Sequence, residues 1–352
     1  MAIVTIVGAG MMGTALCWPL IDNRHTVRLV GTPLDEQIIQ SIRSNGIHPR
    51  LERAVPPGIQ TYQVGELAHA VKGADLLISG VSSFGTDWFI DTVGPLLQPG
   101  VPVLAVTKGL NLLPDGDLQP LPEYINERLP SHLQGKISLN AIAGPCIAHE
   151  LAARRQTCVV FCGKDAQILT AIRTLFATTY YHISTSLDMK EIEICAALKN
   201  GYALAVGMAI GQYDAAGDDG LAKMYNPQAA LFAQSCLEMS LLLRALGIND
   251  RHVSWLPGAG DLYVTVYGGR TRRLGRLLGQ GYSTRDALKQ LADVTLESVE
   301  VITRVASALP RLAQRSLLNP LQFPLLRMLD DVLNKNEPVD FAWHEFFQPL
   351  PD

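Results

Sequence analysis

The first half of the chain alternates short apolar runs with turns that contain glycine. The runs stand at residues 2–7, 25–31, 74–84, 102–110 and 138–150. Short β-branched runs bounded by turn residues are typical of strands buried inside a parallel sheet. From about residue 188 the pattern changes to long helices, and the first of these, residues 189–211, is rich in Ala and Gly. We therefore expect an α/β domain with a mostly parallel sheet at 1–187 and an all-helical domain at 188–352.

Length and composition support this division and exclude some classes of function. A chain of 352 residues is too long for one ordinary core, so two domains are expected. Hydrophobic residues make up 48% and charged residues 18%, which is typical of a globular protein. The net charge is −4, whereas a general nucleic-acid binder would be basic. We therefore expect no nucleic-acid partner.

Cysteine spacing, the N-terminus and hydropathy indicate a cytoplasmic protein without a metal site. The six cysteines show no zinc-like spacing, and Cys158 and Cys162 are expected to share one face of a strand as buried thiols. The N-terminus lacks the charged region of a signal peptide. The nearest candidate for a membrane span, residues 194–211, carries Lys199 and Asn200, so no membrane insertion is expected.

A glycine motif follows the first predicted strand directly. Gly8, Gly10 and Gly13 stand in GxGxxG spacing within "GAGMMGTAL", after a buried-looking strand and at the start of an apolar helix. In that context the first glycine allows the tight turn, the second lets the backbone approach a pyrophosphate, and the third lets the helix pack on the strand. The motif predicts a Rossmann domain that binds a dinucleotide through these glycines and their neighbours Met11, Met12 and Thr14.

The choice between NAD and NADP is not readable from the second strand. NAD enzymes often place an acid at its end, and NADP enzymes favour a nearby arginine. This chain has Gly31, Thr32 and Pro33 there, which meets neither rule. Asp35 and Glu36 follow, and we expect them to be charges at the start of a helix.

Three further predicted strands end in residues suited to binding a ligand. Ligands of open parallel sheets lie at the carboxyl ends of the strands. The ends here carry Phe84 after two serines, Lys108 before a glycine, and Cys146 after Gly144 and Pro145. Lys108 is either a ligand-binding residue or a solvated loop charge, and its place between a buried strand and a glycine favours ligand binding.

Lys199 and Asn200 lie inside the predicted helix of small residues. A lysine with apolar residues on both adjoining turns risks desolvation, which lowers its pKa and suits it to proton exchange near neutral pH. Alternatively, the side chain reaches water or pairs with a carboxylate. Periodicity does not decide between these alternatives.

A cluster of arginines stands in the segment "GAGDLYVTVYGGRTRRLGRLLGQG", residues 258–281. Thr265 follows Asp261 at helical spacing, and Arg270, Arg272, Arg273 and Arg276 come after two glycines. Glycines allow a ligand to approach the backbone closely, and an arginine fork binds phosphate well. We expect one or two of these arginines to bind a small anion and the others to face solvent.

These motifs together resemble the NAD(P)-dependent glycerol-3-phosphate dehydrogenase family. "GAGMMGTAL", "AVTKGL", "GPCIAHE", "EICAALKNGYALAVG", "GAGDLYVTV" and "RTRRLG" are similar to six motifs of that family and occur in the same order. The resemblance implies a Rossmann domain followed by an all-α domain of the 6-phosphogluconate-dehydrogenase-like type. It implies NAD(P)H-dependent, reversible reduction of dihydroxyacetone phosphate to sn-glycerol 3-phosphate by a homodimer.

The resemblance also implies roles for individual residues. Lys199 is expected to be the general acid/base, with Lys108 and Asp261 bordering the same site. Arg270 is expected to hold the substrate phosphate and to touch the cofactor. The other implied substrate contacts are Gly144, Cys146, Asn200, Thr265 and Thr271. The other implied cofactor contacts are Gly8, Gly10, Met11, Met12, Gly13, Thr14, Phe84, Lys108, Ala148 and Glu297.

The chain departs from the family pattern mainly where substrate is expected to bind. Gly269, Arg270 and Thr271 stand where the family has Ser-Arg-Asn, and an alternative gap would put Arg272 at the arginine position. The segment "HPRLERAVPP" follows the family's HPxYLP element only loosely. These changes leave open a dehydrogenase of the same fold with another small phosphate or keto acid as substrate. A non-catalytic NAD(P)-sensing protein is the second alternative, and the retention of Lys108, Lys199 and Asp261 argues against it.

Overall fold

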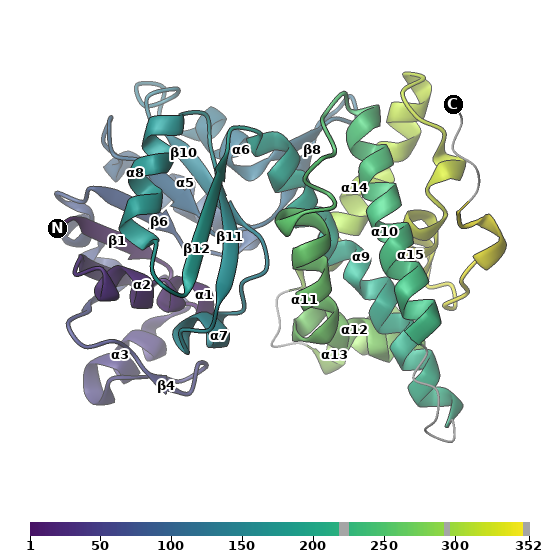
Figure 1. Ribbon diagram of the computed structural model, residues 1–352, viewed down its shortest axis with the longest axis horizontal. Helices are drawn as coiled ribbons and strands as arrows, with labels where there is room; N and C mark the ends of the chain where they lie inside the picture. The colour runs from purple at the N-terminus through teal and green to yellow at the C-terminus, as the bar shows by residue number, and fades with distance from the viewer. Residues whose placement is uncertain (218–224, 292–295, 348–352) are drawn as a thin grey trace. The chain divides into compact units, whose positions relative to one another are not determined.

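The computed structural model describes residues 1–217, 225–291 and 296–347. The chain forms two compact units. The first unit contains residues 1–108 and 121–189, and the second contains residues 109–120 and 190–352. The first unit is an α/β domain and the second is mostly helical, as the hydrophobic pattern predicted (Figure 1).

An eight-stranded sheet forms the centre of the first unit. The strand order is β12-β11-β10-β7-β6-β1-β2-β5, and every neighbouring pair is parallel except β10 with β11. The mostly parallel Rossmann sheet is therefore confirmed. The strands are β1 (Ile3–Val7), β2 (Thr26–Val30), β5 (Gln60–Tyr62), β6 (Leu76–Ser79), β7 (Val103–Ala105), β10 (Leu139–Ala143), β11 (Thr157–Cys162) and β12 (Tyr181–Ser186).

Helices cover both faces of this sheet because successive strand residues point to opposite sides. Leu76 and Ile78 of β6 belong to one apolar core, whereas Leu77 belongs to the other. The first core includes α1 (Met11–Ala15), α2 (Cys17–Asp22), α3 (Glu36–Asn45), α7 (Ala148–Ala152) and α8 (Ala166–Phe176). The second includes α4 (Leu67–Val71), α5 (Thr86–Thr92) and α6 (Leu121–Arg128). A small hairpin of β3 (Ile47–His48) and β4 (Arg53–Ala54) follows α3.

The second unit is built around the long helix α9 (Met189–Ala216). By length and composition α9 could cross a bilayer, but 89% of its most apolar window is buried inside the structure, as in the core helix of a globular protein. The surrounding elements are α10 (Tyr225–Ala245), α11 (Asp261–Tyr267), α12 (Gly269–Gly279), α13 (Thr284–Gln290), α14 (Glu297–Gln314), α15 (Pro324–Asn334) and the hairpin of β8 (Leu110–Leu112) with β9 (Leu118–Pro120).

Glycines bring α12 into close contact with α9. A Cβ atom on Gly211 of α9 would lie 2.1 Å from the carbonyl oxygen of Arg276, and one on Gly275 of α12 would lie 2.5 Å from that of Leu204. Both distances are far shorter than real carbon–oxygen contacts. Glycines thus let the two helices pack closely, and the arginine-bearing helix is held against the helix that carries Lys199.

The prediction that Cys158 and Cys162 are both buried is wrong for Cys158. Cys162 is buried beside Ala141 of β10, whereas Cys158 is exposed. β10 pairs only with residues 160–162 of β11, so the beginning of β11 has its neighbour on one side alone. There Cys158 pairs with the exposed His182 of β12.

Candidate active site

The glycine turn has the geometry that a dinucleotide site requires. Gly8 has a φ of 117°, which L side chains rarely adopt. A Cβ atom on Gly13 would lie 2.2 Å from the Gly8 carbonyl oxygen, so the helix can pack here only with glycine. A Cβ atom on Gly10 would meet nothing within 4 Å, which leaves the backbone open to a ligand. These residues fit a dinucleotide cofactor.

The side chain of Asp35 supports this glycine turn. The sequence led us to expect Asp35 and Glu36 to be charges at a helix start, and Glu36 does begin α3. The Asp35 carboxylate makes no capping bond. Its Oδ2 instead accepts hydrogen bonds from the backbone N–H of Ala9 at 3.1 Å, and from the backbone N–H and hydroxyl of Thr32 at 2.9 and 2.8 Å. Asp35 therefore stands at the helix start as expected, at the N-cap of α3, and its carboxylate has the additional role of holding the glycine turn.

His48 supports the same turn from the β3–β4 hairpin, and the sequence reasoning missed it. Its Nε2 lies 2.9 Å from the carbonyl oxygen of Ala9. Its Nδ1 accepts from the backbone N–H groups of Arg50 and Leu51, so the ring proton is on Nε2 and is donated to Ala9. Burial lowers the pKa of His48 and favours this neutral form. The available signal was the loosely matched "HPR" segment, which we treated as a departure from a pattern.

Other predicted cofactor and substrate residues of the first unit stand at strand ends. After β10, Gly144 has a φ of 115°, and Cys146 lies 3.9 Å from Met12, sulfur to sulfur. Ala148 begins α7 and is buried. Met11 and Thr14 lie in α1, where Met11 is exposed and Thr14 is buried. The ends of β10 and β1 thus come together within this unit.

The residues after β6 and β7 also reach the carboxyl side of the sheet. Phe84 lies in a short 3₁₀ turn (Ser83–Gly85) and is 60% exposed, which is unusual for a large apolar side chain. Lys108 is half-buried in the loop after β7. The preceding Thr107 donates its hydroxyl proton to the Val81 carbonyl and so ties this loop to the one after β6.

In the second unit Lys199 forms a buried ion pair. Its Nζ lies 2.8 Å from Asp261 Oδ1 and 2.8 Å from the hydroxyl oxygen of Thr265. The Lys199 and Asp261 side chains are only 7% and 3% exposed. Thr265 donates its own proton to the Asp261 carbonyl, which orients its oxygen toward the ammonium. Of the alternatives that the sequence left open, Lys199 pairs with a carboxylate and does not reach bulk water. Asn200 follows it on α9 and is half-buried.

The arginines occupy different environments along α12. Arg270, in the first turn, and Arg273 are exposed. Arg272 is half-buried and donates to the Tyr267 carbonyl at 3.0 Å, and Arg276 pairs with Asp214 at 2.7 Å. Thr271 lies on the buried face of the helix. Arg270 and Arg273 are therefore the two arginines of the cluster whose side chains face solvent. Glu297, which begins α14, is half-buried.

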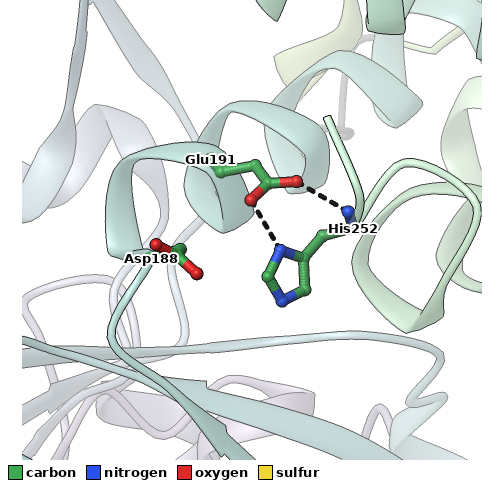
Figure 2. Close-up of side chains that lie close together, drawn as sticks. All are labelled: Asp188, Glu191 and His252. Atoms are coloured by element: carbon green, nitrogen blue, oxygen red, sulfur yellow. Dashed lines mark hydrogen bonds and ion pairs between the residues drawn. The ribbon is translucent and has the colours of Figure 1, made fainter. Parts of the chain in front are cut away.

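A second buried pair joins α9 to the segment that leads to Asp261 (Figure 2). Glu191 accepts from the backbone N–H of His252 with one carboxylate oxygen and from the His252 ring Nδ1 with the other, both at 2.6 Å. The two side chains are 1% and 5% exposed. Figure 2 also draws Asp188, which precedes the helix. Donors of His252 thus engage both oxygens of Glu191.

Comparison with known proteins gives a consistent result over the whole chain. The family model for the N-terminus of NAD-dependent glycerol-3-phosphate dehydrogenase matches residues 3–169, and the model for its C-terminus matches residues 188–344. The NADP(+)-dependent glycerol-3-phosphate dehydrogenase of Archaeoglobus fulgidus is 34% identical over 290 residues, which cover 82% of this chain and 83% of that protein.

Two further relatives extend the similarity. A glycerol-3-phosphate dehydrogenase [NAD(P)+] from Bacillus velezensis is 30% identical over 345 residues, covering 96% of this chain and 92% of the relative. The crystal structure of glycerol-3-phosphate dehydrogenase from Coxiella burnetii superposes with a TM-score of 0.80 at 25% identity, covering 96% and 95% of the two chains. With both halves matched, this chain belongs to the NAD(P)-dependent glycerol-3-phosphate dehydrogenase family of oxidoreductases.

Proposed function

We propose that this protein reduces dihydroxyacetone phosphate to sn-glycerol 3-phosphate with NADH or NADPH, reversibly, and that Lys199 is its general acid/base. The observation that carries the proposal is the buried pair of Lys199 with Asp261 at 2.8 Å. A lysine held out of bulk water by a carboxylate and a hydroxyl is positioned to deliver a proton at one defined point.

In the second unit one residue transfers the proton and two others hold that residue in place. A nicotinamide cofactor, when bound, supplies the hydride that reaches the C2 carbonyl carbon. The carbonyl oxygen gains negative charge as the C–H bond forms, and the Lys199 ammonium gives it a proton. Asp261 and Thr265 hold the ammonium in place through their 2.8 Å contacts. In the reverse direction the neutral amine takes the hydroxyl proton back.

The remaining residues would bind and orient the two ligands. Arg270 grips the substrate phosphate, because its exposed guanidinium can offer two parallel N–H donors. The other substrate contacts are Lys108, Gly144, Cys146, Asn200, Thr265 and Thr271. The cofactor is held by Gly8, Gly10, Met11, Met12, Gly13, Thr14, Phe84, Lys108, Ala148, Arg270 and Glu297. In this scheme residues 1–187 bind the dinucleotide and residues 188–352 bind substrate and carry the acid/base.

We also propose that the protein acts in the cytoplasm as a homodimer. The family's small phosphorylated substrate and the absence of zinc-like or disulfide-like cysteine spacing in the sequence support the cytoplasm. The dimer rests on analogy of fold alone, and light scattering of the purified protein tests it.

A substrate panel with each coenzyme tests the proposed reaction. Oxidation of NADH and of NADPH is followed with dihydroxyacetone phosphate, other ketose phosphates and keto acids, all at the same low concentration. We expect dihydroxyacetone phosphate to give the highest kcat/KM. A clear preference for another compound would mean that the changed Gly269–Thr271 segment has altered the substrate. Tight coenzyme binding without turnover of any compound would instead indicate a sensing protein.

A further inference from the structure

We propose that this protein prefers NADP(H) to NAD(H), and that Arg50 binds the 2′-phosphate that distinguishes them. The inference deepens the proposed function, since it concerns the coenzyme of the same site. NAD enzymes of this fold usually place a carboxylate at the end of the second strand, where it accepts hydrogen bonds from the ribose hydroxyls. Residues 31–35 offer no exposed carboxylate, and the first exposed acid after β2 is Glu36, which begins α3.

The end of β2 is closed to an acidic side chain. The first residue after the strand is Gly31, where a Cβ atom would lie 2.8 Å from a side-chain carbon of Ile39. Asp35 is the only acid of the 31–35 loop, and it is 8% exposed. Its Oδ2 already accepts three hydrogen bonds, from Ala9 and Thr32. This buried carboxylate is therefore used to hold the glycine turn.

Arg50 supplies the positive charge that a 2′-phosphate requires. The backbone N–H of Arg50 donates to the His48 ring, and that ring donates to the carbonyl of Ala9 in the glycine turn. The exposed Arg50 is thereby tethered beside the turn. Within residues 1–217, 225–291 and 296–347 its guanidinium has no ion-pair partner, so its fork is available for a phosphate.

Two other arginines near β2 are committed to protein groups. Arg28 donates to the carbonyls of Ala70 and Lys72, and Arg43 is bonded to Thr61 and Glu66. Arg53 lies opposite His48 on β4 of the same hairpin and is also exposed, whereas the His48 ring accepts its hydrogen bonds from Arg50 and Leu51. Arg53 is the matched control.

Calorimetric binding to the full-length protein tests the proposal without relying on activity. The ligands are NADP⁺, NAD⁺, adenosine 2′,5′-bisphosphate and 5′-AMP. We expect NADP⁺ to bind about tenfold or more tightly than NAD⁺. Arg50→Ala should weaken NADP⁺ and the bisphosphate by about tenfold or more and leave NAD⁺ and 5′-AMP unchanged, because one charge-assisted fork is lost. Arg53→Ala should leave the affinity for all four ligands unchanged.

The contrary outcomes are distinct. Equal affinity for the two coenzymes, tighter NAD⁺ binding, or the same loss from Arg53→Ala as from Arg50→Ala would overturn the coenzyme preference alone. Failure to bind either coenzyme would overturn the preference together with the proposed function.

A different observation supports a second inference: Glu191 and His252 are positioning residues for the Lys199–Asp261 pair. Glu191 lies eight residues before Lys199 on α9, so the two side chains leave the helix about 80° apart, from the same half of its surface. Glu191 fixes both the backbone and the ring of His252. This role also rests on the proposed function.

The chain between His252 and Asp261 is compact enough to transmit this restraint. Ala259 donates to the Val253 carbonyl at 2.6 Å, and Gly260 donates to the Trp255 carbonyl at 3.0 Å. The restraints therefore form a closed path. It runs from α9 through Glu191 and His252 to the short π-helical turn (Leu256–Gly260), and from Asp261 back to Lys199 on α9.

Alanine at either position should affect the chemical step and leave binding intact. We expect Glu191→Ala and His252→Ala to lower kcat and to shift its pH profile, with KM and coenzyme affinity changed by less than about twofold. His252→Asn should recover much of kcat, because its amide N–H can replace the ring Nδ1–H. The control is Glu238→Gln, which alters a buried carboxylate of the same unit that bonds Tyr202 and the start of α15.

The control variant and an unfolding experiment distinguish a positioning role from a general destabilisation of the second unit. An equal shift of the pH profile in Glu238→Gln, or no recovery in His252→Asn, would overturn the role. Thermal unfolding of Glu191→Ala, Lys199→Met and the double variant gives a readout that needs no turnover. The changes in Tm should be non-additive if the closed path couples the two residues, and additive changes would also overturn the inference.

Discussion

Replacing Lys199 by methionine tests both the proposed proton transfer and the ion pair that holds the lysine. Methionine keeps a similar length and removes the charge. If Lys199 is the general acid, kcat should fall by about 10²- to 10⁴-fold. Coenzyme affinity should remain unchanged, because the glycine turn belongs to the core of the other unit.

The burial of the pair sets the expected effect on stability. The Lys199 and Asp261 side chains are 7% and 3% exposed, so Lys199→Met leaves a buried carboxylate without its ammonium. Breaking such a pair costs about 3–5 kcal/mol in the free energy of unfolding. Asp261→Asn should lower the free energy of unfolding by a similar amount, because the buried Lys199 ammonium loses the Asp261 carboxylate. The double variant removes both charges and should cost less than the sum, with a coupling free energy of about 2–3 kcal/mol.

Urea unfolding of the four proteins and oxidation of NADPH with dihydroxyacetone phosphate measure the two effects. Lys190→Met is the matched control, because Lys190 stands on the same helix and pairs with Asp117 at 3.1 Å while both side chains are about one-third exposed. It should cost about 1 kcal/mol or less and keep full activity. A Lys199→Met variant that retained more than about a tenth of kcat would remove this lysine from the mechanism. Additive unfolding energies, within about 0.5 kcal/mol, would refute the coupling.

Three further substitutions are informative. Arg270→Ala should raise the KM for dihydroxyacetone phosphate about tenfold or more. Arg273→Ala should have little effect in the same steady-state assay, and the reverse order would show that Arg273 and not Arg270 binds the phosphate. Gly10→Val should abolish coenzyme binding in calorimetry and leave the free energy of unfolding unchanged, because a Cβ atom there meets no protein atom. Gly13→Ala should instead lower the free energy of unfolding by roughly 1–3 kcal/mol, since its Cβ atom would lie 2.2 Å from a backbone oxygen. Burial raises the pKa of Glu238 from 4.5 to about 7. The folded protein then binds more protons than the unfolded chain across that window, so stability should fall by about 3 kcal/mol as pH rises through it. Glu238→Gln should flatten this fall in urea titrations on either side of the window, and an unchanged slope would contradict the assignment.

The dinucleotide turn could be predicted from sequence because its determinants are local. Gly8, Gly10 and Gly13 are each required for steric reasons that lie within one strand–turn–helix unit. The structure shows those steric restrictions at the expected positions. Asp35 and His48 could not be predicted in the same way. They reach the Ala9 backbone from 26 and 39 residues away, and their places in the sequence do not show these distant partners.

The environment of Lys199 shows the same limit. Periodicity placed the lysine among apolar residues but left its partner open, because a buried ion pair and an exposed ammonium are both compatible with that spacing. The structure decides by bringing in Asp261 and Thr265 from 62 and 66 residues away. Glu191 and His252, which are 61 residues apart, were missed for the same reason.

The arginine segment shows what helix packing adds to an alignment that leaves the position of the key arginine ambiguous. Helical spacing says which arginines share a face, but it does not say which face is buried. The glycine contacts between α9 and α12 settle this point, because Gly275 must face α9 and the buried Thr271 lies one turn before it. Arg272 is then drawn to the Tyr267 carbonyl, while Arg270 is left exposed at the first turn. The alternative gap would assign the phosphate to Arg272, of which Nη1 already bonds the protein, so Arg270 remains our proposal.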